Sequence, residues 1–292
     1  MIGFEPDKRA FEKLAKDETP GFRYINTALS DRTKELNFLL TRKQECSSGF
    51  QPDAEFFKRF AESQRFDVIG RESCDAVAMD EALRENGVTD VDFVKIDAEG
   101  AEIEIMRGGA ETIAHGVFGL ELEVAFVPFR KGQPVFADID QVVREQGFDL
   151  FDIQGAYWKR KVGIDYGKPK GQLIFGNALY LRRAAVFAEQ IIARVADPLE
   201  RKSKLLRAVS ICLLYGYKDY ALELLDVIAG VLSTEERQAV EASIKREPLF
   251  HYRRIPHFPG KGRVSAFFHV LSELFKSTIG GWGFMERTLG NL

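Results

Sequence analysis

The sequence predicts an α/β fold, with a doubly wound sheet in its first part and an all-α extension after it. Apolar runs of strand length alternate with amphipathic helical segments as far as Arg183, which is typical of strands and helices packed in layers. From Ala184 onward only helical patterns follow. The chain has 292 residues, 45% of them hydrophobic, which is enough for a sizeable core. We therefore expect two units, residues 1–183 and 184–292.

The N-terminal residues predict a strand, a helix and a second strand. Met1–Pro6 is the end of a strand, Asp7–Lys16 is a helix, and Phe22–Leu29 alternates in the manner of the next strand. Glu5 ends the first of these strands. In nucleotide-binding α/β domains an acidic residue at this place accepts hydrogen bonds from ribose hydroxyls.

A long polar segment, Thr41–Arg65, interrupts the regular pattern. Phe56, Phe57 and Phe60 share one helical face within it, so we expect a lid over the domain and not a disordered loop. After it the sequence predicts two short strands that pair at a sheet edge and then a helix: Phe66–Gly70, Ser73–Met79 and Asp80–Asn86.

The stretch Val91–Gly109, VDFVKIDAEGAEIEIMRGG, is the most informative part of the chain. Its apolar start is too short for a buried helix and predicts a central parallel strand that ends at Asp97. Asp97, Glu99 and Glu102 then surround Gly100, and a helix follows that closes at Gly108–Gly109. Ligands of open α/β sheets lie at such strand ends, so we expect the site here. The alternative is that Asp97 only caps the helix and the glutamates offset its positive end.

The next predicted strand, Val117–Val124, carries Glu121 and Glu123 on one face. Glu123 is the better site candidate because it lies nearer the open end of the strand, where a carboxylate avoids the cost of burial. Three further elements complete the first unit: a helix at Ile139–Gln146, a strand at Phe148–Ile153 and a final antiparallel strand at Leu173–Leu181.

The second unit is predicted to be helical and to add no strand to the sheet. Four helices are expected, at Ala184–Ala196, Leu199–Tyr215, Lys218–Ala229 and Thr234–Arg246. A proline- and glycine-rich linker precedes one more helix, whose apolar stripe contains Val264, Phe267, Phe268, Leu271, Leu274 and Phe275. The stripe needs a cover, which can be the body of the protein, a second subunit or another protein partner.

Composition excludes several classes of function. The net charge of −3 comes with no clustered basic face, so nucleic acid is not an expected partner. Three well-separated cysteines and the lack of an apolar run of about 18 residues favour a cytoplasmic protein without a membrane span. The four histidines show no metal-binding spacing, and no metal is expected.

Three stretches resemble one family. Together with Val91–Gly109, the segments FEPDKRAFEKL (Phe4–Leu14) and ALSD (Ala28–Asp31) resemble FkbM-type S-adenosylmethionine-dependent methyltransferases. The resemblance implies the Rossmann-like class I fold with strand order 3-2-1-4-5-7-6. It implies that Glu5, Pro6, Ala28 and Leu29 face S-adenosylmethionine, and that Asp97, Glu99 and Glu123 are the catalytic candidates.

The resemblance extends roughly from Met1 to Arg183 and lacks the family's first strand and glycine-rich loop. Strands two and four of the family order would then face an empty slot between them. We expect either that the chain is an N-terminally truncated piece, or that another segment or chain fills the slot.

The expected activity is transfer of a methyl group to a hydroxyl of a sugar, a glycan or a secondary metabolite. Asp97, Glu99 and Glu123 are all available as the base, and the sequence does not separate them. The alternative is a non-catalytic scaffold derived from a methyltransferase, whose helical part binds a protein partner.

Overall fold

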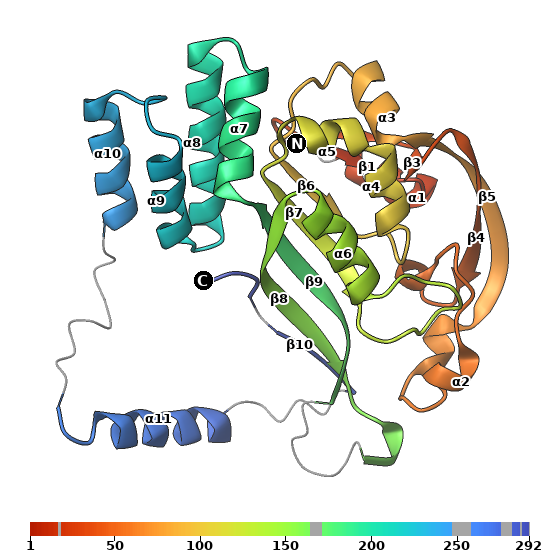
Figure 1. The fold of residues 1–292 in the computed structure, drawn as a ribbon. Coiled ribbons are helices and arrows are strands. Elements are labelled where there is room, and N and C mark those ends of the chain that lie inside the picture. Colours follow the sequence, from red (N-terminus) through yellow and green to blue (C-terminus); the bar gives the residue numbers. More distant parts are fainter. Residues whose placement is uncertain (17–18, 164–170, 247–257, 276–281, 287, 292) are drawn as a thin grey trace.

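The strands of the protein fall into three sheets (Figure 1). The computed structural model describes residues 1–16, 19–163, 171–246, 258–275, 282–286 and 288–291. The strands are β1 Ile2–Phe4, β2 Arg23–Ile25, β3 Ala28–Ser30, β4 Lys34–Thr41, β5 Val68–Ala78, β6 Phe93–Ile96, β7 Gly119–Ala125, β8 Phe148–Trp158, β9 Gln172–Arg182 and β10 Gly283–Met285. The α-helices are α1 Lys8–Leu14, α2 Ala54–Phe57, α3 Met79–Glu85, α4 Glu102–Gly108, α5 Ala110–Gly116, α6 Phe136–Glu145, α7 Ala184–Arg194, α8 Pro198–Leu214, α9 Lys218–Val227, α10 Thr234–Lys245 and α11 Lys261–Phe275.

The largest sheet has five strands in the order β10-β8-β9-β7-β6. β6 and β7 are parallel, whereas β9 is antiparallel to both β7 and β8, which confirms the predicted final antiparallel strand. One face packs against α4, α5 and α6. Leu120 and Leu122 of β7 lie fully buried on that face together with Met106 of α4 and Val143 of α6.

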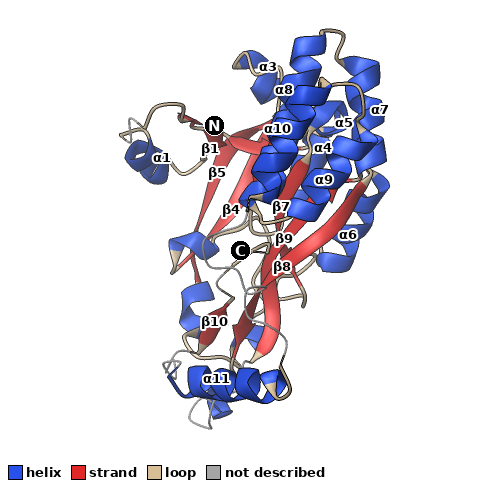
Figure 2. Ribbon diagram, turned by 90° about the vertical axis from the view of Figure 1, so that its left-hand side faces the viewer, coloured by secondary structure: helices blue, strands red, loops and turns tan. Residues whose placement is uncertain are grey.

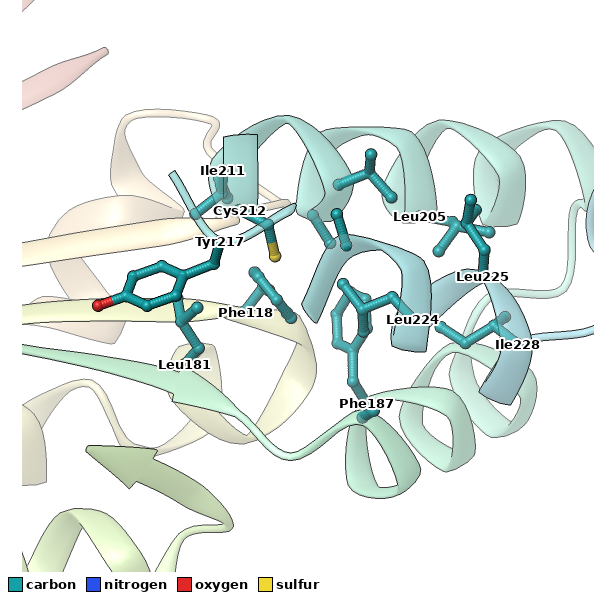
Figure 3. Close-up of a cluster of buried hydrophobic side chains, with 14 of the residues drawn as sticks. Phe118, Leu181, Phe187, Leu205, Ile211, Cys212, Tyr217, Leu224, Leu225 and Ile228 are labelled. Atoms are coloured by element: carbon teal, nitrogen blue, oxygen red, sulfur yellow. The ribbon is translucent and has the colours of Figure 1, made fainter. Parts of the chain in front are cut away.

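Helices α7, α8 and α9 cover the opposite face (Figure 3). Leu179 and Leu181 of β9, with Phe118 just before β7, share one apolar core with Phe187 of α7 and Leu224 of α9. The boundary predicted at Arg183 therefore falls between β9 and α7, inside a continuous core. The predicted helices between residues 184 and 246 are confirmed within a few residues at each end.

The prediction that the second unit adds no strand was wrong. β10 pairs antiparallel with β8, and the main-chain N–H of Glu286 donates to the carbonyl of Gly155. The GFM segment, Gly283–Met285, has only three residues, so its sequence carries too little periodicity to mark a strand.

β1 and β2 form a separate parallel pair. In the described part of the chain no strand lies between β1 and β6, and a cavity of about 560 Å³ is lined by residues of both strands. The cavity lies where the strand order implied by the resemblance leaves a slot. Figure 2 shows β1 and α1 to one side of the helices that cover the five-stranded sheet.

Two predicted strand boundaries were wrong. Phe22–Leu29 divides into β2 and β3, because the Asn26 side chain donates hydrogen bonds to the carbonyls of Glu5 and Pro6 and turns the chain there. The two short strands predicted between residues 66 and 79 are one strand, β5, which pairs with β3 on one side and with β4 on the other. β4 itself was not predicted.

The segment predicted as a lid, Thr41–Arg65, is anchored by its aromatic residues. Phe57 and Phe60 are only 2% exposed and pack with Phe66, Phe129 and Trp158. The rings of Phe57 and Phe66 stack with their centroids 3.7 Å apart. The segment is therefore a fixed cover and part of the core of the domain.

Most of the described side chains of helix α11 are exposed. Phe267 and Phe268 remain 63% and 61% exposed, and Val264 and Val270 are exposed as well. The predicted stripe members Leu274 and Phe275 have side chains outside the described set. None of the described helices combines the length and the apolar composition that crossing a membrane requires.

An ion-pair cluster joins α8 to the sheet. Lys204 has a side chain only 4% exposed and lies 2.9 Å from a carboxylate oxygen of Asp92, with Asp90 as a second partner. Arg207 pairs with the same two carboxylates from the more exposed side of the helix. Because Lys204 is buried, its charge depends on these partners.

We predict that Lys204→Met lowers the free energy of unfolding by about 1–3 kcal/mol, since Asp90 and Asp92, 40% and 24% exposed, keep part of their hydration. The control is Arg207→Met, for which a change below about 1 kcal/mol is expected because this side chain is 38% exposed. Urea denaturation of both variants gives the comparison. An equal loss of unfolding free energy in both variants would show that the burial of Lys204 does not determine its contribution to stability.

Candidate functional site

The acidic turn after β6 is organised by a buried glutamate. Glu102 is 2% exposed, and its Oε1 accepts the main-chain N–H groups of Ala98 (3.0 Å) and Gly100 (3.2 Å). Gly100 has φ +111°, a conformation that favours glycine. Asp97, in contrast, does not cap helix α4, which begins after Ala101 without a side-chain cap. The alternative in which Asp97 serves as the helix cap is therefore wrong.

Glu99 is held in a left-handed conformation, with φ +53°. Such a conformation costs a residue other than glycine about 1–3 kcal/mol and persists only where its surroundings hold it. The Ser48 hydroxyl donates to the Glu99 carbonyl at 2.7 Å, and Arg130 forms an ion pair with the Glu99 carboxylate. Burial raises the pKa of Glu99, and the Arg130 guanidinium opposes that shift.

Arg130 lies 1% exposed, and its Nε and Nη1 groups have no hydrogen-bond partner within the described residues. Its guanidinium lies 4.8 Å from the centre of the Phe129 ring, which adds a cation–π contact. The Glu99 carboxylate is thus the main polar partner of a buried cation. Removal of either member would leave a buried charge uncompensated.

Glu123 lies close to the same turn. Burial raises its pKa well above the usual range, and the negative charges of Glu99, Asp97 and Glu102 add to this. The pKa of Asp97 is also raised by partial burial, against the opposing charge of Lys95. Both shifts favour the protonated carboxyl group, more strongly at Glu123, and Asp97 is the more exposed of the two.

The structure brings most of the predicted site residues to one cavity. Glu5, Pro6, Ala28, Leu29, Asp97 and Glu99 all line the 560 Å³ space between β1 and β6. Glu5 uses Oε1 to accept the Asp7 main-chain N–H at 2.8 Å. Glu123 is not in the lining and lies behind the acidic turn, in electrostatic contact with Asp97 and Glu99.

Sequence reasoning missed three residues that shape the site. Arg130, Ser48 and Lys95 hold Glu99 or border Asp97; Lys95 lies within the Val91–Gly109 motif, whereas Arg130 and Ser48 belong to no recognisable motif. One signal was available for Arg130: loops after neighbouring parallel strands meet at the same edge of a sheet, so a cation after β7 should face the acids after β6.

Comparison with known proteins assigns the family. A profile described as Methyltransferase FkbM domain matches residues 1–150. The chain belongs to the FkbM methyltransferase family. No curated protein and no solved structure matches it significantly.

The FkbM domain match includes the acidic turn, Glu123, Arg130 and the cavity wall formed by β1 and β3. It ends before most of β8 and all of β9. The match therefore does not cover the residues that these two strands place near the turn. Among the described residues of the FkbM protein, no group of three potential metal ligands gathers.

Glu102 makes stability depend on pH. Burial raises its pKa from 4.5 to about 7, so between these values the folded protein holds a proton that the unfolded chain has released. The stability contributed by this group is complete below pH 4.5 and declines as the pH rises through about 7.

We predict that Glu102→Gln increases the free energy of unfolding at pH 8 by about 1–3 kcal/mol and leaves it nearly unchanged at pH 5. The amide oxygen still accepts the two N–H groups but carries no charge. Denaturant titrations at both pH values measure the effect, with the exposed Glu111→Gln as the matched control. A variant that is destabilised equally at both pH values would show that Glu102 is needed as a carboxylate.

Proposed function

We propose that the protein is an S-adenosylmethionine-dependent O-methyltransferase that acts on a hydroxyl of a sugar, a glycan or a secondary metabolite. The observation that carries the proposal is the cavity in which Glu5 and Asp97 face the same space from opposite strands. The family assignment supports methyl transfer, and the residues of the cavity support the choice of cofactor and acceptor.

The cavity residues fit S-adenosylmethionine at three places. Glu5 ends β1 with a carboxylate that can accept hydrogen bonds from the ribose hydroxyls. Ala28 and Leu29 provide an apolar wall for the adenine, with Pro6 beside Glu5. Asp97 lines the other side of the same space, where the methyl group would meet the acceptor hydroxyl. The 560 Å³ volume lies in the range of small-molecule sites, about 300–1,000 Å³.

S-adenosylmethionine supplies, when bound, an electrophilic methyl group for an oxygen nucleophile. An alcohol is a weak nucleophile, so the acceptor hydroxyl needs a base within hydrogen-bond reach. Asp97 suits this role best, because Glu99 is paired with Arg130 and burial raises the pKa of Glu123 well above its usual range. Glu99 then fixes the turn that carries Asp97.

We predict that Glu5→Ala weakens binding of S-adenosylmethionine by about 1–3 kcal/mol, since the ribose hydroxyls would lose their partner. Calorimetric titration of the full chain measures the dissociation constant, and Glu12→Ala on the outer face of α1 is the control. An unchanged dissociation constant for Glu5→Ala removes Glu5 from the site.

We predict that Asp97→Asn leaves the melting temperature unchanged and lowers the rate of methyl transfer about 10²–10⁴-fold. The amide keeps the shape of the side chain but accepts no proton. In the unaltered enzyme the rate should fall as the pH drops through the raised pKa of Asp97, because the base becomes protonated. Full turnover by a folded Asp97→Asn protein would contradict the assignment.

The exposed stripe on α11 supports the alternative function, a non-catalytic scaffold. Val264, Phe267 and Phe268 lie on one helical face, and each is at least 44% exposed, which is typical of a surface that binds another protein or a second copy. Binding of S-adenosylmethionine distinguishes the two functions. A scaffold would show no heat of binding with S-adenosylmethionine, and Phe267→Asp with Phe268→Asp would abolish its association in sedimentation experiments.

A further inference from the structure

A row of polar side chains crosses the five-stranded sheet beside the acidic turn. The register pairs Glu123 of β7 with Asn177 of β9, and Asn177 with Gln154 of β8. Ile96, the last paired residue of β6, pairs with Leu122 of β7. Asp97 and Glu123 are the residues that follow this pair, so they also lie side by side. Side chains alternate between the two faces of a sheet, so all four lie on one face. The row connects the cavity wall at Asp97 with the far strand β8.

The row begins where the helical cover of this face ends. Leu179 of β9 is fully buried under the helices. Asn177, two residues away on the same strand and the same face, is only half-buried. Tyr215, at the C-terminal end of α8, donates its hydroxyl to Glu121 at 2.8 Å and marks the limit of the cover. Glu123 and Gln154 are half-buried like Asn177, so the row remains accessible.

Hydrogen bonds fix the two amides and leave other groups of the row free. Asn177 Nδ2 donates to Gln154 Oε1 at 3.2 Å, and Gln154 Nε2 donates to the main-chain oxygen of Glu286 at 2.8 Å. Within the described residues, neither Asn177 Oδ1 nor the carboxyl groups of Asp97 and Glu123 take part in a hydrogen bond. Asp97 and Asn177 Oδ1 can accept hydrogen bonds, and Glu123, whose pKa burial raises, can donate one in its protonated form.

The charges around the row disfavour anions. Asp97, Glu99 and Glu121 are carboxylates; Lys95 is paired with Glu121 at 2.8 Å, and Arg130 is paired with Glu99. Arg65 is a further cation near Glu99, and its guanidinium lies over the rings of Phe66 and Trp282. A phosphate or carboxylate placed at the start of the row would approach the Asp97 carboxylate, which has no ion-pair partner among the described residues.

Building on the proposed function, we propose that Glu123, Asn177 and Gln154 form the acceptor subsite. The acceptor is an uncharged, polyhydroxylated molecule longer than one sugar ring, which lies along the row with its reacting hydroxyl at Asp97. Three strand spacings of about 4.8 Å make the row about 14 Å long. Hydroxyls donate and accept, which matches this mixture of groups, whereas an apolar acceptor would leave the groups unpaired.

The test uses the full chain with a panel of neutral trisaccharides built from glucose, mannose, galactose or rhamnose, and with trigalacturonic acid as the anionic counterpart. Saturation-transfer NMR and calorimetry measure binding. We expect at least one neutral trisaccharide to bind. Asn177→Leu should bind it at least tenfold more weakly. Gln141→Leu, which changes an exposed amide on α6, should bind it as the unaltered protein does. We expect trigalacturonic acid to bind at least tenfold more weakly than the neutral ligand at low salt, and this difference to shrink at high salt.

Three outcomes would overturn the subsite: no neutral trisaccharide binds, Asn177→Leu binds as the unaltered protein does, or the anionic trimer binds more tightly. Titration of Asn177→Leu with S-adenosylmethionine separates this result from the proposed function. Unchanged cofactor binding together with lost saccharide binding supports the subsite. If the unaltered protein binds the trisaccharide but not S-adenosylmethionine, the methyltransferase proposal fails and the saccharide site stands.

Discussion

The burial of the Glu102 carboxylate inside the turn after β6 is the constraint on which the site depends. Its two hydrogen bonds to Ala98 and Gly100 close the turn before α4 begins, and they satisfy main-chain groups that the helix cannot reach. With the turn closed, Asp97 faces the cavity and Glu99 adopts its left-handed conformation. Arg130 and Ser48 then hold Glu99 from two other parts of the chain. The site is therefore one connected structure, although its members are far apart in sequence.

The two faces of the five-stranded sheet have different roles. Helices α4 to α6 pack against one face in a continuous apolar core, and this face supports the turn. Helices α7 to α9 bury only part of the other face and stop near Tyr215. Where they stop, the sheet carries polar side chains in place of leucines, and these side chains lie next to the proposed methyl-transfer site. The helical region thus determines which part of the sheet an acceptor can reach.

The acidic residues of the site divide into three groups according to their surroundings. Glu102 is structural and buried, Glu99 is paired with a buried cation, and Asp97 and Glu123 lack a direct partner among the described residues. Burial and the neighbouring carboxylates favour the protonated form of Glu123. Asp97 stays beside Lys95 at the open edge of β6. Adjacent carboxyl groups whose surroundings shift their pKa values to different extents are typical of acid–base sites.

The sequence by itself determined the parallel strand β6, the acidic turn, the four helices of residues 184–246 and the family, because each depends on local periodicity or on a contiguous motif. It also identified Glu5, Ala28 and Asp97, which the structure brings to one cavity. Only the tertiary structure decided that Glu102 and not Asp97 stabilises the turn, because both are acidic residues near a glycine and only burial separates them. Arg130, β10 and the row through Asn177 and Gln154 depend on strand pairing between distant segments, and no local pattern encodes that register.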